Sequence, residues 1–111
     1  MATNTFKSTS TALTTATTDI YQAPASAGNV AIMLSIQVAN VNGNASADLT
    51  IAKTDSSNNI AGYLAFTIPV PNDSALEVVA NKIVLMAGQK IRGSASANSY
   101  LQATVSVLEI T

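Results

Sequence analysis

The chain of 111 residues contains no cysteine and no histidine, and charged residues make up only 10% of it. Without cysteine, neither disulfide bonds nor cysteine-based zinc sites can form. Without histidine as well, the commonest general base, the thiol nucleophile and most transition-metal ligands are missing together. P-loop, GxSxG and GxGxxG motifs are also absent from the sequence. We therefore expect a protein that is not an enzyme and that holds no cofactor or metal.

The scarcity of charge also limits the partners that the chain can bind. Five Lys and Arg residues against six Asp and Glu residues give a net charge of −1, whereas binding to nucleic acid depends on clustered positive charge. The longest uninterrupted apolar run, residues 30–34, is far shorter than the roughly 20 residues that a membrane helix needs, and the first residues lack the apolar core of a signal peptide. We expect a soluble protein that binds neither nucleic acid nor membrane. Its weakly charged surface favours association with other protein subunits.

Alternation of apolar and polar residues, typical of β-strands, is the main signal that is present. It is clearest in residues 30–39 and predicts one apolar face made of Val30, Ile32, Leu34, Ile36 and Val38. Asn42-Gly43 follows and predicts a two-residue type I′ turn, with a hairpin to a return strand that begins near Ala47.

Shorter alternating segments, separated by polar turns, follow along the rest of the chain. Strands are expected near residues 19–23, 64–70, 76–80, 82–86, 90–97 and 100–111. In residues 64–70 we expect Leu64, Phe66, Ile68 and Val70 on one face. Pro69 should place that strand on an edge or end it, because proline cannot donate to a β-ladder. About eight short strands without a helix predict an all-β fold, an antiparallel β-sandwich or barrel.

One polar turn in residues 55–59 needs a separate interpretation. Asp55, Ser57 and Asn59 alternate as oxygen ligands do in some calcium loops, but the loop lacks the glycine and the closing glutamate of such sites. We interpret it as a hairpin turn whose side chains bond their own backbone.

The last strand raises a question, because its alternation changes near the end. Leu101, Ala103, Val105 and Val107 share one face. Leu108 and Ile110 then fall on the opposite, previously polar face, and Glu109 falls on the apolar one. A bulge, another segment of the same chain or a neighbouring subunit could cover these residues.

The first residues differ from the rest in composition. Residues 1–18 are rich in Ser and Thr, and after Met1 their large side chains are Phe6 and Leu13. We expect them to form an edge strand or an arm that orders on a partner, preceding a β-sandwich domain at residues 19–111.

Several segments together resemble a known family. The order and spacing of IYQAPA, AIMLSIQVANVNG, IPVPNDSALEVV, KIVLMAGQKIRGSASA and SVLEIT resembles short virion structural proteins of tailed bacteriophages, of the capsid decoration (cement) type. The resemblance covers nearly the whole chain, although Gln89 stands where similar sequences more often carry an acidic residue. It implies a jelly-roll-like β-sandwich that is often trimeric.

The resemblance also implies a function without chemistry. The expected role is that of a homo-oligomer, a trimer, that binds the phage major capsid protein on the outer head surface and reinforces the shell. Its location would be the virion, after assembly in the host cytoplasm. The residues expected at oligomer or capsid contacts are Phe6, Lys7, Leu13, Leu108 and Ile110. The alternatives are a tail, adaptor or fibre-associated protein, or a glycan-binding module, although Tyr21, Tyr63 and Tyr100 are more typical of half-buried strand residues than of a sugar site.

Overall fold

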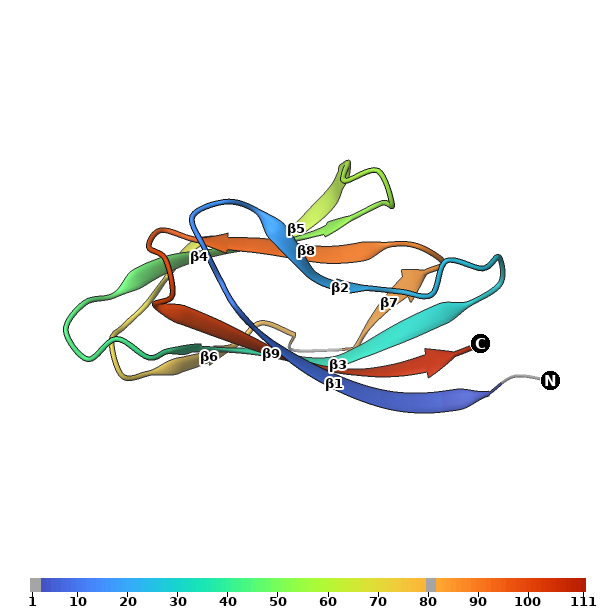
Figure 1. Ribbon diagram of the computed structural model, residues 1–111, viewed down its shortest axis with the longest axis horizontal. Helices are drawn as coiled ribbons and strands as arrows, with labels where there is room; N and C mark the ends of the chain where they lie inside the picture. Colours follow the sequence, from blue (N-terminus) through green and yellow to red (C-terminus); the bar gives the residue numbers. More distant parts are fainter. Residues whose placement is uncertain (1–2, 80–81) are drawn as a thin grey trace.

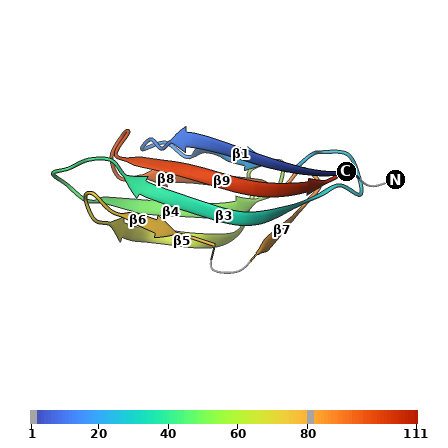
Figure 2. The same cartoon turned by 90° about the horizontal axis from the view of Figure 1, so that it is seen from below.

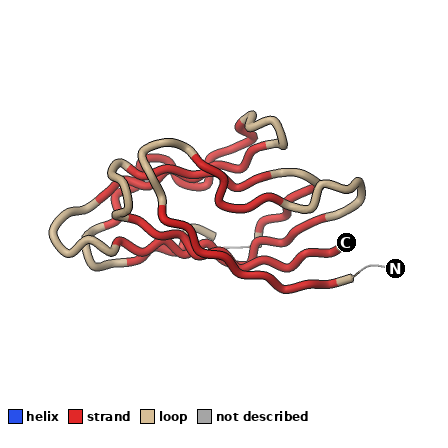
Figure 3. Tube along the Cα trace, in the orientation of Figure 1, coloured by secondary structure: helices blue, strands red, loops and turns tan. Residues whose placement is uncertain are grey.

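The computed structural model describes residues 3–79 and 82–111, and every regular element among them is a β-strand (Figures 1 and 3). The strands are β1 (Asn4–Ala12), β2 (Thr18–Gln22), β3 (Val30–Asn40), β4 (Ala47–Thr54), β5 (Ile60–Val70), β6 (Ala75–Glu77), β7 (Ile83–Met86), β8 (Lys90–Ala95) and β9 (Leu101–Ile110). The predicted all-β fold is therefore confirmed, with nine strands rather than about eight. The predicted strand at residues 76–80 is shorter than expected, and its last residue lies outside the described residues.

The strands form two antiparallel sheets that face each other (Figures 1 and 2). Sheet I has the order β1-β9-β3-β6, with β7 also paired to β3, and sheet II has the order β2-β8-β4-β5. The pairs are nested along the chain, from β1 with β9 at the outside to β4 with β5 at the centre. This nesting, divided between two sheets, is the jelly-roll arrangement, so the predicted jelly-roll-like β-sandwich is confirmed.

In strands β8 and β9, the apolar residues of the alternating pattern face the core between the two sheets. In β9, Leu101, Ala103, Val105 and Val107 are all buried. In β8, Ile91, Gly93 and Ala95 are buried in the same way. A regular strand places every second side chain on the same face, so these two strands follow their sequence pattern without interruption.

The predicted hairpin at Asn42-Gly43 is wrong, because β3 and β4 lie in different sheets. Asn40 at the end of β3 is buried, and its side-chain amide donates to the carbonyls of Val70 at 2.9 Å and Ala45 at 3.1 Å. Its Oδ1 accepts the backbone N–H of Asn42 at 2.9 Å. These bonds hold the loop that carries the chain from one sheet to the other. Among the described glycines only Gly28 and Gly88 have a positive φ, so Gly43 lacks the conformation of a type I′ turn.

The predicted apolar face of β3 is also wrong over its first half. The pairing of β3 with β9 shifts register between Met33 and Ser35, which marks a bulge. Ala31 and Met33 are consequently the fully buried residues before the bulge, and Ile36 and Val38 are the buried ones after it. Val30, Ile32 and Leu34 are moved to the outer face of sheet I and are only half-buried.

Strand β5 departs from its predicted face for a similar reason. Its pairing with β4 contains several register shifts, and Thr67 has a positive φ of 48°. Ala65 and Val70 are buried as a result, while Phe66 and Ile68 are exposed. The prediction from Pro69 is confirmed, because β5 is the edge strand of sheet II and ends at Val70.

Two further segments have the local structure that their composition indicates. Of the alternatives for residues 1–18, the structure shows an edge strand, because β1 pairs with β9 from Asn4 to Ala12. In the turn after β4, Asp55 Oδ1 accepts the N–H groups of Ser57 at 2.8 Å and Asn59 at 2.9 Å, as the backbone-bonded interpretation predicts. Within residues 3–79 and 82–111, no group of three metal-ligating side chains and no membrane-spanning helix is found.

Candidate assembly surface

Strand pairing brings apolar residues together on the outer face of sheet I. They lie at the end of the sheet where β1 begins and β9 ends, on the right in Figure 2. They form two neighbouring cross-strand rows over β1, β9, β3 and β7. One row contains Phe6, Leu108, Ile32 and Val84, and the next contains Ile110, Val30 and Met86. We call these residues the apolar patch.

The apolar patch is unusually open to solvent for side chains of its kind. Phe6 is 75% exposed, Met86 55% and Val84 48%, while the other members are half-buried by their neighbours. The rows contain no charged residue, since Asn4 completes the second row on β1. Four strands span about 14 Å at a spacing of about 4.8 Å. A contiguous apolar surface of this kind is typical of a site where another protein binds.

The patch ends abruptly along the same strands. Beyond Phe6 and Leu108 the outer face of β1 and β9 carries Ser8 opposite Ser106, and then Ser10, whose hydroxyl lies 3.0 Å from that of Thr104. Apolar residues therefore cover one half of the face and short polar residues cover the other. The division argues for a local contact surface, because a sheet that another element of its own chain covered would be apolar throughout.

The structure brings together three of the residues that the sequence predicted for this surface. Phe6, Leu108 and Ile110 are all members of the apolar patch. The prediction is wrong for Leu13, which is fully buried in the core between the sheets. Its backbone N–H donates to the carbonyl of Leu101 at 2.8 Å, which brings its side chain over the core just after β1 ends.

Lys7 also lies away from the patch, because neighbouring residues of a strand point to opposite faces. Its partner is Glu109, whose carboxylate Oε1 lies 3.0 Å from Lys7 Nζ. Val84 and Met86 could not be predicted from the sequence, because residues 83–86 show no alternation. It missed Val30 and Ile32 because the bulge in β3 has no clear sequence signal.

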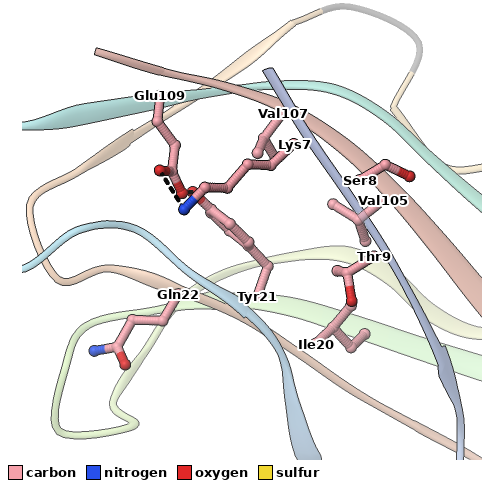
Figure 4. Close-up of a pocket in the computed structure, with 9 residues that line it drawn as sticks. All are labelled: Lys7, Ser8, Thr9, Ile20, Tyr21, Gln22, Val105, Val107 and Glu109. Atoms are coloured by element: carbon pink, nitrogen blue, oxygen red, sulfur yellow. Dashed lines mark hydrogen bonds and ion pairs between the residues drawn. The ribbon is translucent and has the colours of Figure 1, made fainter. Parts of the chain in front are cut away.

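Glu109, the charged residue on the apolar face of the last strand, is covered by other parts of the same chain. It continues the core-facing series of β9, and its side chain is only 7% exposed. Tyr21 of β2 donates a hydrogen bond from its hydroxyl to Oε2, so that the carboxylate is held between Lys7 and Tyr21 (Figure 4). These contacts join β1 and β9 of sheet I to β2 of sheet II.

The same residues line a pocket of about 560 Å³ at the edge of the sandwich, between β1 and β2 (Figure 4). Ile20, Val105 and Val107 form its apolar part. Burial on its own would raise the pKa of Glu109, but hydrogen bonds from Tyr21 and Lys7 and the charge of Lys7 lower it below its ordinary value. Burial, followed by the hydrogen bond and charge of Glu109, raises the pKa of Tyr21. Glu109 is therefore an ionised and partnered carboxylate with a structural role.

Comparisons with known proteins support the fold. No protein-family profile matches the chain, and no curated protein matches its sequence. A solved structure of Bacillus endospore appendages, described as a novel family of disulfide-linked pili, is similar over 98% of this chain and 86% of its own, with a TM-score of 0.60 and 9% identity. At this identity the similarity shows the fold alone. The disulfide linkage of those pili has no counterpart here, since the chain has no cysteine.

The subviral particle of infectious bursal disease virus VP2 is a second similar structure. The match covers 98% of this chain but 32% of that one, at 10% identity and a TM-score of 0.49. The predicted membership of a phage decoration family thus stays a prediction.

Proposed function

We propose that the protein is a structural subunit that assembles through the apolar patch, and specifically a decoration protein of a bacteriophage head. In this role it forms a homo-oligomer, a trimer, on the outer surface and reinforces contacts between major capsid subunits. It is made in the host cytoplasm and resides in the virion. The observation that carries the proposal is the uncharged, exposed patch on one half of sheet I.

The patch can supply the required binding energy without any chemical reaction. Phe6 alone exposes 75% of its surface. Taking about 200 Å² for a phenylalanine side chain, its burial removes roughly 150 Å² from water and contributes at most about 4 kcal/mol. Repetition of this contact by the symmetry of an oligomer and of a shell would multiply its effect.

The proposal is tested by placing charge in the patch. The double variant Leu108→Asp/Ile110→Asp should keep its β circular dichroism, because both side chains point away from the core. Its mass by light scattering should fall to that of a monomer, and its occupancy on purified phage heads should be lost. The single variant Phe6→Asp should act in the same direction with no cost to folding, since Phe6 is mostly exposed.

The polar half of the same face provides the matched control. Gln102→Asp/Thr104→Asp adds the same charge on β9, on the same side of sheet I but outside the patch. This variant should retain the oligomeric mass and the occupancy of the wild type. Equal losses in the control, or an unchanged mass and occupancy in both patch variants, would contradict assembly through the patch.

A tail, adaptor or fibre-associated virion protein is the second candidate, since it would use the same fold and the same surface. Electron cryomicroscopy of the source particle separates the two. Density for many copies over the head supports decoration, whereas density confined to the tail rejects it.

A further inference from the structure

The outer face of sheet II contains a trough of about 190 Å³ that has no role in the proposed assembly. One cross-strand row forms it, in which Ala52 of β4 lies between Arg92 of β8 and Tyr63 of β5. Ala52 is only 6% exposed. The methyl group of Ala52 is much shorter than the side chains of Arg92 and Tyr63 on either side of it. The outer surface of sheet II is therefore recessed at this point.

Tyr63 forms one wall of the trough. The side chain is 50% exposed, although the sequence indicated a half-buried strand residue. Phe66 packs against it edge to face, with ring centroids 4.8 Å apart and an interplanar angle of 69°. This contact restrains the tyrosine ring, so a ligand that stacks on it loses little side-chain entropy from the protein.

Arg92 forms the opposite wall and is also held in place. Its Nε donates to Asp19 Oδ1 at 2.7 Å and its Nη2 to the carbonyl of Thr17 at 3.2 Å. Asn58, at the end of the trough, accepts a hydrogen bond from Lys90 through Oδ1 at 2.9 Å. Among the described contacts, Arg92 Nη1 and Asn58 Nδ2 donate to no protein acceptor. Fixed donors therefore remain for a ligand.

Two threonines on β4 flank Ala52, and Thr50 adds a further donor. Thr50 Oγ1 accepts the backbone N–H of Thr67 at 3.2 Å, which leaves its hydroxyl proton to donate. Thr54 is only 2% exposed and its Oγ1 donates to the carbonyl of Asp55 at 3.0 Å, so this residue forms part of the floor of the trough. The trough thus combines an aromatic surface with hydrogen-bonding groups in fixed positions, a combination that suits a ring bearing hydroxyl groups.

We propose that this trough binds one ring of a neutral saccharide, whose apolar face stacks on Tyr63 and whose hydroxyl groups bond Arg92, Asn58 and Thr50. The volume equals roughly six water molecules at about 30 Å³ each, which suits a single sugar unit and is below the roughly 300–1,000 Å³ of sites for larger ligands. A neutral ring suffices because Arg92 already has a carboxylate partner in Asp19, at 2.7 Å, so that it needs no acidic group from the ligand.

The location of the trough is compatible with simultaneous assembly. The trough lies on the outer face of sheet II and the apolar patch on the outer face of sheet I, so a subunit attached through the patch would leave the trough accessible. Saccharide binding itself does not depend on the proposed function.

Saturation-transfer difference NMR on the full chain tests the proposal. The probes are the methyl glycosides of glucose, galactose, mannose, N-acetylglucosamine and N-acetylneuraminic acid, the last as the charged probe. We expect transfer to the ring C–H protons of at least one neutral glycoside, with millimolar affinity. Tyr63→Ala should weaken this affinity about tenfold, the size of effect expected for loss of an aromatic contact.

Two variants make the result specific. Ala52→Leu should abolish transfer by filling the trough without removing a polar group. Val41→Ala, which shortens an exposed apolar side chain outside both the trough and the apolar patch, should leave the affinity unchanged. Absence of transfer to every neutral probe, retention of binding in both trough variants, or tighter binding of the N-acetylneuraminic acid glycoside would overturn the proposal.

Discussion

The hydrogen bond between Tyr21 and Glu109 provides a quantitative test of how the two sheets are joined. Tyr21 belongs to β2 of sheet II and Glu109 to β9 of sheet I. Because the Glu109 side chain is only 7% exposed, water cannot easily replace the tyrosine hydroxyl. Tyr21→Phe removes this donor and leaves the packing of the ring intact.

The expected loss of stability in Tyr21→Phe can be compared with the loss on removing Lys7, the second partner of Glu109. A hydrogen bond to a buried charged group contributes about 1.5–3 kcal/mol, so we expect Tyr21→Phe to lower the free energy of unfolding by about 2 kcal/mol. Lys7 is 57% exposed, and solvent screens its ion pair. Lys7→Met should therefore cost only about 0.5 kcal/mol. For a domain of this size, a loss of about 2 kcal/mol lowers the melting temperature by roughly 8 °C.

Urea unfolding followed by far-ultraviolet circular dichroism measures both losses, and Tyr100→Phe is the matched control. Tyr100 is half-buried, and its hydroxyl makes no hydrogen bond among the described residues, so this change should cost less than about 0.5 kcal/mol. A larger loss for Lys7→Met than for Tyr21→Phe, or equal losses for the two tyrosine variants, would refute the reasoning.

The hydrogen bond between Tyr21 and Glu109 should also make the stability of the fold depend on pH. The pKa of Glu109 in the folded protein lies below its ordinary value of 4.5 because, despite burial, the partners Tyr21 and Lys7 favour the charged form. The ionised carboxylate thus stabilises the fold above that ordinary value, and this contribution is lost as the pH falls through the lower, folded pKa. The difference in the free energy of unfolding between wild type and Tyr21→Phe should have its full value at pH 7. In urea titrations at pH 3 this difference should be smaller.

Three further substitutions test the packing, with urea unfolding as the measurement for all of them. In Gly93→Ala the new Cβ would lie 2.9 Å from Ile20 Cδ1 and 3.0 Å from the Thr50 carbonyl oxygen. We expect a loss of about 1–3 kcal/mol from this overpacking, and a variant of unchanged stability would show that Ile20 and the β4 backbone at Thr50 move aside at no cost. Leu13→Ala should cost about 2–5 kcal/mol, because Leu13 is fully buried in the core. Leu108→Ala should cost less than about 1 kcal/mol in the monomer; equal losses would place Leu108 in the core.

Much of the fold could be predicted where local pattern and tertiary environment agree. The alternation in residues 101–107 predicts a strand with one buried face, and the structure has it there. Pro69 predicts an edge strand because a missing N–H is tolerated only there, and β5 lies at the edge of sheet II. The jelly-roll arrangement itself was implied by family resemblance and not by alternation, because strands of the same pattern can pair in many orders.

Predictions failed where a single residue changes the side to which its neighbours point. The bulge between Met33 and Ser35 moves Ile32 from the predicted core to the outer face, and no turn residue marks it. The crossing after Asn40 depends on a hydrogen bond to Val70, far along the chain. Such a contact exists only after the two sheets have come together.

For the candidate assembly surface as well, some residues could be predicted from the sequence and others could not. Phe6, Leu108 and Ile110 could be selected from sequence because each is a large apolar residue on a face that is otherwise polar. Leu13 was selected on similar grounds and is buried, because the chain turns inward immediately after β1. Burial depends on that turn, which the composition of residues 1–18 does not specify.

By itself, the sequence determined the chemical character of this protein: strands without helices, little charge, and a change of apolar face after Val107. Tertiary structure alone decided which residues those strands bring together. Register between β1, β9, β3 and β7 joins Phe6 to Leu108 and Ile110 to Met86 through Val30, which makes separate apolar residues into one patch. The physical reason is that alternation fixes which side chains share a face within a strand, whereas neighbours across strands depend on pairing, and pairing is a property of the whole fold.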